Sequence, residues 1–392
     1  MQKEETSPEF RFILECCRCE PSPGLLHRLL REYLATCYPE QENVCWKTLI
    51  FFAYNHGVFP LVYRTLTAHS PDMIPAEITG QMKLLQRRIA YRNMLMSAEL
   101  LRIVRLLEHN GIKMLAFKGP VLAQSAYGDI TLRQFGDLDI LVGKAEALQV
   151  VALLEHDGYQ PEIVLKGRQK KAFFAAVNVL GLDKPPKGLR IETHWELLSK
   201  NYAVRWDMIP LWSRARSVDI NGTSLPVPSP TDHLLYLCVH GSKHLYQRLE
   251  WVNDVDRLVR AGPGPDWPGL FALAQEMGVV RMVYLSLWLC RELLALPLPE
   301  SIILAIEKDR TACELGRRIV SMQSGRVGKS YGTFRLLWRM RERLRDRLRF
   351  AVYGLLLPKF DDFALVVLPK YLFFLYPAVR LYRLSAKYRK RG

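Results

Sequence analysis

The feature that most limits how this chain can fold is a pair of aspartates at the start of an apolar run. Asp137 and Asp139 lead into Ile-Leu-Val at positions 140–142, a sequence typical of a buried strand. Side chains alternate along a strand, so both carboxylates should project from one face and Leu138 from the other. Neighbouring carboxylates repel each other unless a cation lies between them, and Mg²⁺ prefers such oxygen ligands together with substrate phosphates. The pair therefore predicts a metal-dependent phosphoryl- or nucleotidyl-transfer site, although solvated strand ends also carry such pairs.

The segment before the aspartates supports the metal-site interpretation. Residues 113–117 form an apolar run typical of a buried strand, which ends at Lys118-Gly119-Pro120. Glycine permits a tight turn, and proline suits the first turn of a helix. A helix that starts at a glycine turn can bind anions through its free N–H groups. The aspartate strand follows about 18 residues later, a spacing that suits a crossover helix with short loops.

This order of strand, glycine turn, helix and Asp-x-Asp strand resembles the core of the polymerase-β-like nucleotidyltransferase superfamily. The wider sequence is similar to one uncharacterised nucleotidyltransferase family, and the likeness covers residues 40–260. The segments that carry it are Trp46 to Leu66, Lys118-Gly119, Tyr127-Gly128-Asp129, Arg133, Gly136 to Val142, and His240-Gly241-Ser242-Lys243-His244 with Trp251 and Asp254.

The resemblance implies an α+β fold in which a small mixed sheet holds two Mg²⁺ ions, with Mn²⁺ as an alternative, and an NTP such as ATP. Asp137 and Asp139 would bind both ions, and a third acid on a neighbouring strand would bind the catalytic one and lower the pKa of the acceptor hydroxyl. Residues 190–197 alternate as a strand does, and Glu192 is the preferred third acid because the family places an acid two residues before a histidine there. His194 would position the acceptor or hold Glu192. An ordinary half-exposed strand is the alternative.

The chain departs from the superfamily at the turn before the first helix. The superfamily usually has Gly-Ser there, whereas this chain has Lys118 and Gly119 with no hydroxyl. The Lys118 ammonium, together with Arg133, would neutralise phosphate charge instead. The missing serine leaves two alternatives open, phosphoryl transfer at the same metal site and a non-catalytic membrane scaffold with a degenerate core. If the site is catalytic, replacing Asp137 or Asp139 by Ala should abolish turnover and leave the fold intact.

A second group of polar residues lies downstream of the strands. His240, Lys243 and His244 are spaced three and four apart, so on a helix they share one face. Beside the metal site, that face could meet the nucleotide or the acceptor. A polar stripe that only packs against neighbouring helices is the alternative.

The chain of 392 residues is expected to contain four regions. They are an N-terminal helical region (1–110, with helices at 22–36, 43–55, 59–68 and 76–109), the nucleotidyltransferase core (111–228), a helical region that packs on it (229–325), and a basic, aromatic-rich region (326–392). The acidic start lacks the apolar stretch of a secretory signal. The eight cysteines are interpreted as thiols in a reducing cytosol, which predicts a cytoplasmic enzyme.

Positive charge is concentrated near the C-terminus. The net charge of the chain is +16, and residues 326–392 hold 17 Lys or Arg against 4 Asp or Glu, a net charge of +13. Arginines at alternate positions from 339 to 349 should spread around one helix. The apolar block at 364–379 is interrupted by prolines and is too short to span a bilayer.

This composition fits an anionic membrane surface, with Phe373, Phe374 and Tyr376 inserted, and would place the enzyme at the inner face of the membrane. A nucleic acid is the competing partner, and a tail that packs on the protein itself is a third interpretation. The acceptor could be a small molecule, a saccharide or a peptide.

Overall fold

A computed structural model describes residues 6–37, 42–164, 168–186, 188–262, 264–324, 333–366 and 368–389. The N-terminal region is helical, as predicted, and the four expected helices are present at nearly the expected bounds. One earlier helix was not expected. The five helices are α1 (Pro8–Cys17), α2 (Pro23–Ala35), α3 (Glu42–Asn55), α4 (Phe59–His69) and α5 (Ala76–His109). Proline occupies the first turn of α1, α2 and α4, where a missing N–H costs nothing.

The expected mixed sheet is confirmed and has five strands in the order β1-β2-β5-β4-β3. They are β1 (Met114–Ala116), β2 (Leu138–Val142), β3 (Gln160–Pro161), β4 (Val179–Lys184) and β5 (Leu189–His194). The expected crossover between β1 and β2 is wrong, because these strands pair antiparallel. After β1 the chain forms only one turn of α-helix, α6 (Gly119–Leu122), and a π-helical turn (Ala123–Tyr127). A loop then leads into β2. Strands β2 and β5 pair in parallel.

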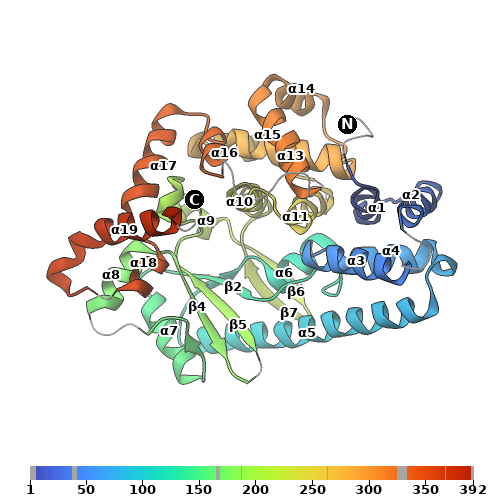
Figure 1. The fold of residues 1–392 in the computed structure, drawn as a ribbon. Helices are drawn as coiled ribbons and strands as arrows, with labels where there is room; N and C mark the ends of the chain where they lie inside the picture. Colours follow the sequence, from blue (N-terminus) through green and yellow to red (C-terminus); the bar gives the residue numbers. More distant parts are fainter. Residues whose placement is uncertain are drawn as a thin grey trace.

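The two faces of β2 meet different parts of the molecule. Leu138, Ile140 and Val142 belong to one apolar core with α5 and with α7 (Ala147–His156). Leu141, which shares the face of Asp139, belongs to a second core. Figure 1 shows the long helix α5 running below the sheet, with α10 (Pro230–Lys243) and α11 (Leu249–Arg260) above it. The strand alternation predicted from the sequence therefore directs the aspartates toward α10 and α11.

The second core joins the N-terminal helices α1–α4 to helices from much later in the chain. Those later helices fill the region predicted to be helical, and a small hairpin precedes them. The helices after α11 are α12 (Trp267–Met277), α13 (Val280–Leu294), α14 (Glu300–Lys308) and α15 (Arg310–Gln323). Between β3 and α10 the chain also forms α8 (Arg168–Ala176), η4 (Lys200–Tyr202), α9 (Met208–Ser213), β6 (Arg216–Ile220) and β7 (Thr223–Val227).

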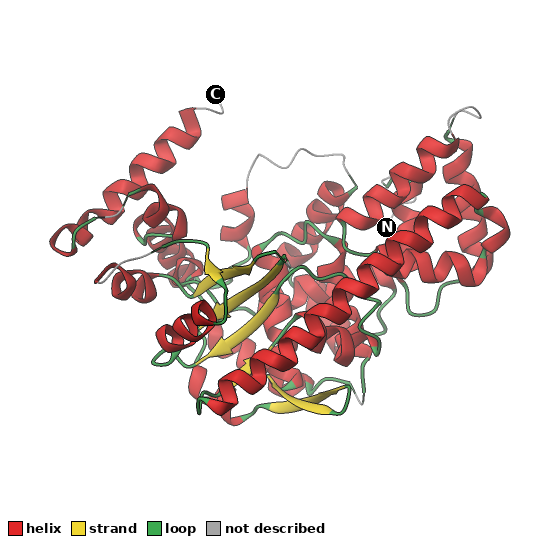
Figure 2. Ribbon diagram, turned by 90° about the horizontal axis from the view of Figure 1, so that it is seen from below, coloured by secondary structure: helices red, strands yellow, loops and turns green. Residues whose placement is uncertain are grey.

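The C-terminal region consists of short helices, and the last of them ends at the outer edge of the molecule, near the C-terminus marked in Figure 2. They are α16 (Thr333–Arg339), α17 (Leu344–Leu356), α18 (Phe360–Leu365), η5 (Lys370–Leu375) and α19 (Tyr376–Arg389). The single helix expected across the alternating arginines is wrong, because the chain breaks between α16 and α17. Tyr376 is buried and packs on Phe363, whereas Phe374 is exposed. None of the helices in the described ranges is both long and apolar enough to cross a membrane.

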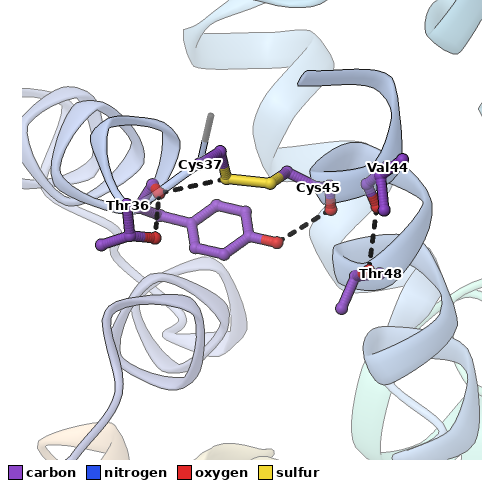
Figure 3. Close-up of a disulfide and its surroundings, with 6 residues drawn as sticks. Thr36, Cys37, Val44, Cys45 and Thr48 are labelled. Atoms are coloured by element: carbon purple, nitrogen blue, oxygen red, sulfur yellow. Dashed lines mark hydrogen bonds between the residues drawn. A yellow bond between two sulfur atoms is a disulfide. The ribbon is translucent and has the colours of Figure 1, made fainter. Parts of the chain in front are cut away.

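Two of the eight cysteines form a disulfide, which corrects the expectation that all are thiols. Cys37 follows α2 and Cys45 lies in α3, with their Cα atoms 6.5 Å apart (Figure 3). Beside them the Tyr33 hydroxyl donates to the Cys45 carbonyl across 2.8 Å. No local pattern predicted this pairing, because it depends on how α2 and α3 pack. The other six cysteines are free, and all but Cys19 are buried or contact the core closely.

Candidate active site

The parallel pairing of β2 with β5 brings the predicted acids together. Asp139 lies directly opposite Glu192 in the register of the two strands. Ligand atoms of Asp139, Glu192 and His194 all lie within 4.8 Å of one another, so they could share a metal ion. Asp137 precedes β2 and lines the same cleft as Glu192 and His194.

Asp139 is the most heavily engaged of the acids. Its Oδ1 accepts hydrogen bonds from Lys118 Nζ at 2.9 Å and from His194 Nε2 at 3.1 Å. Burial alone would raise the pKa of Asp139, but Lys118 and His194 hold it well below its ordinary value. Removing this carboxylate would leave a buried ammonium without its partner. That cost argues against the expectation that Asp139 can be replaced without loss of stability.

Two further observations fit a divalent cation at this position. Among the described residues, Asp139 Oδ2 is buried and has no hydrogen-bond partner. Burial and the charge of Asp139 raise the pKa of Asp137 to about 6. The first is an oxygen free to act as a ligand, and the second shows that the two aspartates are close enough to repel each other. Three carboxylates with a free oxygen are a suitable ligand set for Mg²⁺, which binds hard oxygen ligands.

His194 lies between two of the acids. Its Nε2 is 3.1 Å from Asp139 Oδ1 and 3.4 Å from Glu192 Oε2. The hydrogen bond from His194 lowers the pKa of Glu192. Although burial opposes it, bonding to both carboxylates raises the pKa of His194 itself. Of the two roles predicted for His194, this geometry favours holding Glu192 in place.

The turn at Lys118 and Gly119 brings the backbone close to the aspartate strand. Gly119 has a φ of +52°, and a Cβ there would lie 3.3 Å from the carbonyl oxygen of Asp137. A side chain would be strained at this position, which explains the glycine. The α-helix that follows has only four residues. The fixed charge at this turn is therefore the Lys118 ammonium, which points at Asp139.

Arg133, predicted to bind phosphate, is held by an acid that the sequence did not connect with it. Its Nε and Nη2 each donate to a carboxylate oxygen of Asp254 at 2.8 Å, and the Tyr127 hydroxyl donates to the same carboxylate at 2.8 Å. Asn93 of α5 donates to the carbonyls of Ile130 and Arg133. These contacts anchor the loop that ends at Asp137.

Asp137 and Glu192 line a cleft of about 920 Å³, and Asp139 lies buried behind it. His240 and Lys243 of α10 line it together with His244, the residue directly after the helix, so the helix face predicted from their spacing is in the cleft. Burial, with the charges of Lys243 and Lys118, lowers the pKa of His244 to about 3. Burial and Lys118 lower the pKa of Lys243 to about 8. Burial, with the charge of Lys118, also lowers the pKa of His240. Both shifts favour neutral imidazoles on this wall, so Lys243 is its source of positive charge.

The cleft contains further polar residues that sequence reasoning did not select. They come from the end of α3, from α5, from the residue before β4, from α10 and from the beginning of α11 with the residue before it, so no single spacing pattern connects them. These residues are Asn55, Arg92, Asn178, Tyr236, Arg248 and Glu250.

A mixed sheet in which one aspartate lies in a strand and another directly before it, beside an acid on the adjacent parallel strand, fits the nucleotidyltransferase class. The chain belongs to an uncharacterised nucleotidyltransferase family, whose model matches residues 42–295. The match includes the whole sheet and the helices that face it. No protein of curated function matches the chain.

Proposed function

We propose that the protein is a Mg²⁺-dependent nucleotidyltransferase that transfers a nucleoside monophosphate from an NTP to a hydroxyl or phosphate of an acceptor. The observation that carries the proposal is the register of β2 and β5, which sets Asp139 opposite Glu192. The family match agrees with it. The acceptor is a small molecule, a saccharide or a peptide.

The chemistry assigns a separate task to each group. Asp137 and Asp139 would hold the two Mg²⁺ ions, or Mn²⁺ in their place, and Glu192 would share the catalytic ion. Bound metal supplies charge that stabilises the attacking and leaving oxygens. An acceptor oxygen forms a bond to the α-phosphorus of the NTP, the bond to the β-phosphate bridging oxygen breaks, and pyrophosphate leaves. Through the catalytic ion, Glu192 would lower the pKa of the acceptor hydroxyl, which gives up its proton as it attacks.

The cationic residues of the cleft would meet the triphosphate. Lys118, in the turn after β1, and Lys243, at the end of α10, both line the cleft. Among the described residues, Lys243 forms no ion pair with a carboxylate, so its charge is available to a ligand. Both charges are partly desolvated, which strengthens their contact with phosphate oxygens.

The experiment is a turnover assay with each NTP labelled on the α-phosphate, in the presence of Mg²⁺ and a cell extract as the source of acceptor. We expect labelled product and pyrophosphate from wild type and neither from Asp137→Asn. Asp129→Asn is the matched control, because Asp129 is an exposed acid of the same loop that caps the Thr131 amide across 2.7 Å and lies outside the cleft.

Other products would support the alternatives. Release of nucleoside diphosphate with transfer of the γ-phosphate would identify phosphoryl transfer on the same site. Calorimetry that detects no binding of any NTP, with Mg²⁺ present or absent, would replace the proposal with a non-catalytic scaffold.

A further inference from the structure

Helix α17 presents an apolar stripe to solvent. Leu344, Leu348, Val352 and Leu355 are 66%, 54%, 50% and 47% exposed. Their spacing of four, four and three residues places them within about 80° of one another around a helix with 100° per residue. Single exposed leucines are common on protein surfaces, but a continuous stripe on one helix usually marks a contact surface.

The opposite side of α17 is anchored to the protein, so the stripe is held outward. Asp346 and Phe350 are buried on that side. The Arg341 guanidinium lies 3.7 Å from the centre of the Phe350 ring. Asn201 donates to the carbonyls of Tyr353 and Leu357 at the end of the helix, across 3.1 and 2.9 Å. Rotation of α17 to bury the stripe would break these contacts.

Basic residues surround the stripe. Arg345 is exposed between Leu344 and Leu348, and it also lines a hollow of about 310 Å³ with Arg205, Arg343 and Arg349. Three carboxylates and Arg214 line the same hollow, so arginine outnumbers acid there. The whole region 326–392 carries a net charge of +13. A partner for this surface must therefore combine an apolar layer with negative charge.

Exposed aromatic side chains occur in the neighbouring elements. Tyr371 and Phe374 of η5 and Tyr382 of α19 are 76%, 72% and 69% exposed, and α19 packs against α17. Aromatic rings of this kind are favoured at the boundary between lipid headgroups and acyl chains.

We propose that the α17 stripe rests on an anionic lipid bilayer, with its leucines in the outer acyl layer and its arginines among the headgroup phosphates. A second copy of the chain is a poorer occupant, because two regions of the same strong positive charge would face each other. A nucleic acid would match the arginines but leave the leucines in water. The proposal does not depend on the transferase reaction, since it concerns binding alone.

The test is flotation of the full-length protein with vesicles of phosphatidylcholine alone and of phosphatidylcholine mixed with phosphatidylglycerol, at low and high salt. We expect binding to the anionic vesicles only, weakened by salt. The double variant Leu348→Gln/Val352→Gln should bind about tenfold or more weakly, because it removes two apolar side chains from the acyl layer. Leu304→Gln on α14 is the matched control, since Leu304 is equally exposed, at 50%, on a different helix.

Several outcomes would overturn the proposal. Equal binding to neutral and anionic vesicles would exclude charge recognition, and unchanged binding of Leu348→Gln/Val352→Gln would exclude the stripe. Failure to bind either vesicle, together with a dimer in light scattering that the double variant dissociates, would assign the stripe to self-association. Salt-sensitive binding to a DNA or RNA duplex in place of vesicles, lost in Arg345→Gln but unaffected by the double variant, would assign the surface to nucleic acid.

Discussion

Lys118 Nζ lies 2.9 Å from Oδ1 of Asp139, and the Asp139 side chain is completely buried. Burial alone would lower the pKa of Lys118, but the charge of Asp139 raises it, so the pair is ionised at neutral pH. The ammonium therefore supplies positive charge at the carboxylate that would also bind metal. Its removal should make the protein depend on a divalent cation for stability.

We predict that Lys118→Met lowers the free energy of unfolding by about 3–5 kcal/mol in EDTA, because Asp139 loses its main counter-charge. Mg²⁺ or Mn²⁺ should restore much of this loss, and should raise the melting temperature of the variant more than that of wild type. Thermal unfolding with and without metal measures both effects. Lys144→Met is the control, since its partner Glu196 and Lys144 are both partly exposed. A metal-independent melting temperature in Lys118→Met would contradict a cation site at Asp139.

Arg133 should behave as a structural residue because its guanidinium donates two hydrogen bonds to the Asp254 carboxylate. We predict that Arg133→Met destabilises the protein by about 3–5 kcal/mol by leaving the buried Asp254 carboxylate unpaired. Arg133→Lys should recover little, since an ammonium cannot form the two parallel bonds. Chemical denaturation measures the loss. If Arg133 instead contacts phosphate, NTP affinity would fall while the denaturation midpoint stayed in place.

Lys243, in contrast to Arg133, should contribute to NTP affinity and not to stability. Its ammonium is partly buried and near Lys118, which lowers its pKa to about 8, so replacing it with Met should not reduce stability. The same change should weaken NTP binding by about 1.5–3 kcal/mol, as expected for loss of a charge-assisted hydrogen bond. Calorimetry gives the affinity and thermal unfolding gives the stability. A lower melting temperature with unchanged affinity would show that the helix face is structural.

The buried carboxyl group of Glu250 should make the stability of the protein depend on pH. Burial raises its pKa to about 7, although Arg248 lies 3.0 Å away and opposes the shift. The folded pKa exceeds the ordinary value of 4.5, so the folded protein binds more protons between these values and loses stability as pH rises through about 7. We expect Glu250→Gln to be more stable than wild type by about 1–3 kcal/mol at pH 8. The difference should vanish at pH 4.

Denaturation at several pH values, in EDTA, measures this difference. Glu77→Gln serves as the control, because Glu77 is an exposed acid in the first turn of α5. A constant difference between Glu250→Gln and wild type across the pH range would show that the carboxyl group titrates normally.

Local patterns were sufficient to predict three of the strands, β1, β2 and β5, and the orientation of the acids on β2 and β5. The alternation around Asp137 and Asp139 fixed which residues share a face, and the same rule placed Glu192 and His194 together. The spacing of His240, Lys243 and His244 correctly gave one helix face. Each of these inferences depends only on the geometry of a single element.

The features that the sequence did not reveal all depend on contacts between distant segments. Arg133 and Asp254 are 121 residues apart, and nothing local distinguishes a buried partner from a phosphate ligand. Pairing of Cys37 with Cys45 depends on the angle between two helices. The sense of β1 relative to β2 depends on how α6 packs. The alternating arginines led the sequence analysis to consider only charge at these positions. The exposure of Leu344 and Leu348 between them became clear only from the way α17 packs on the protein.

The joint core of α1–α4 with the helices from α10 onward has a consequence for synthesis on the ribosome. The N-terminal helices emerge first, but the apolar surface they pack against is translated only after the sheet. Strands β1–β5 and helix α5 form most of their core among themselves and can fold as soon as they emerge. The wall of the cleft that carries Lys243 must then dock last, bridging both ends of the chain. We therefore expect nascent chains released before α10 to hold an ordered sheet with its acids exposed, and to require a chaperone for α1–α4.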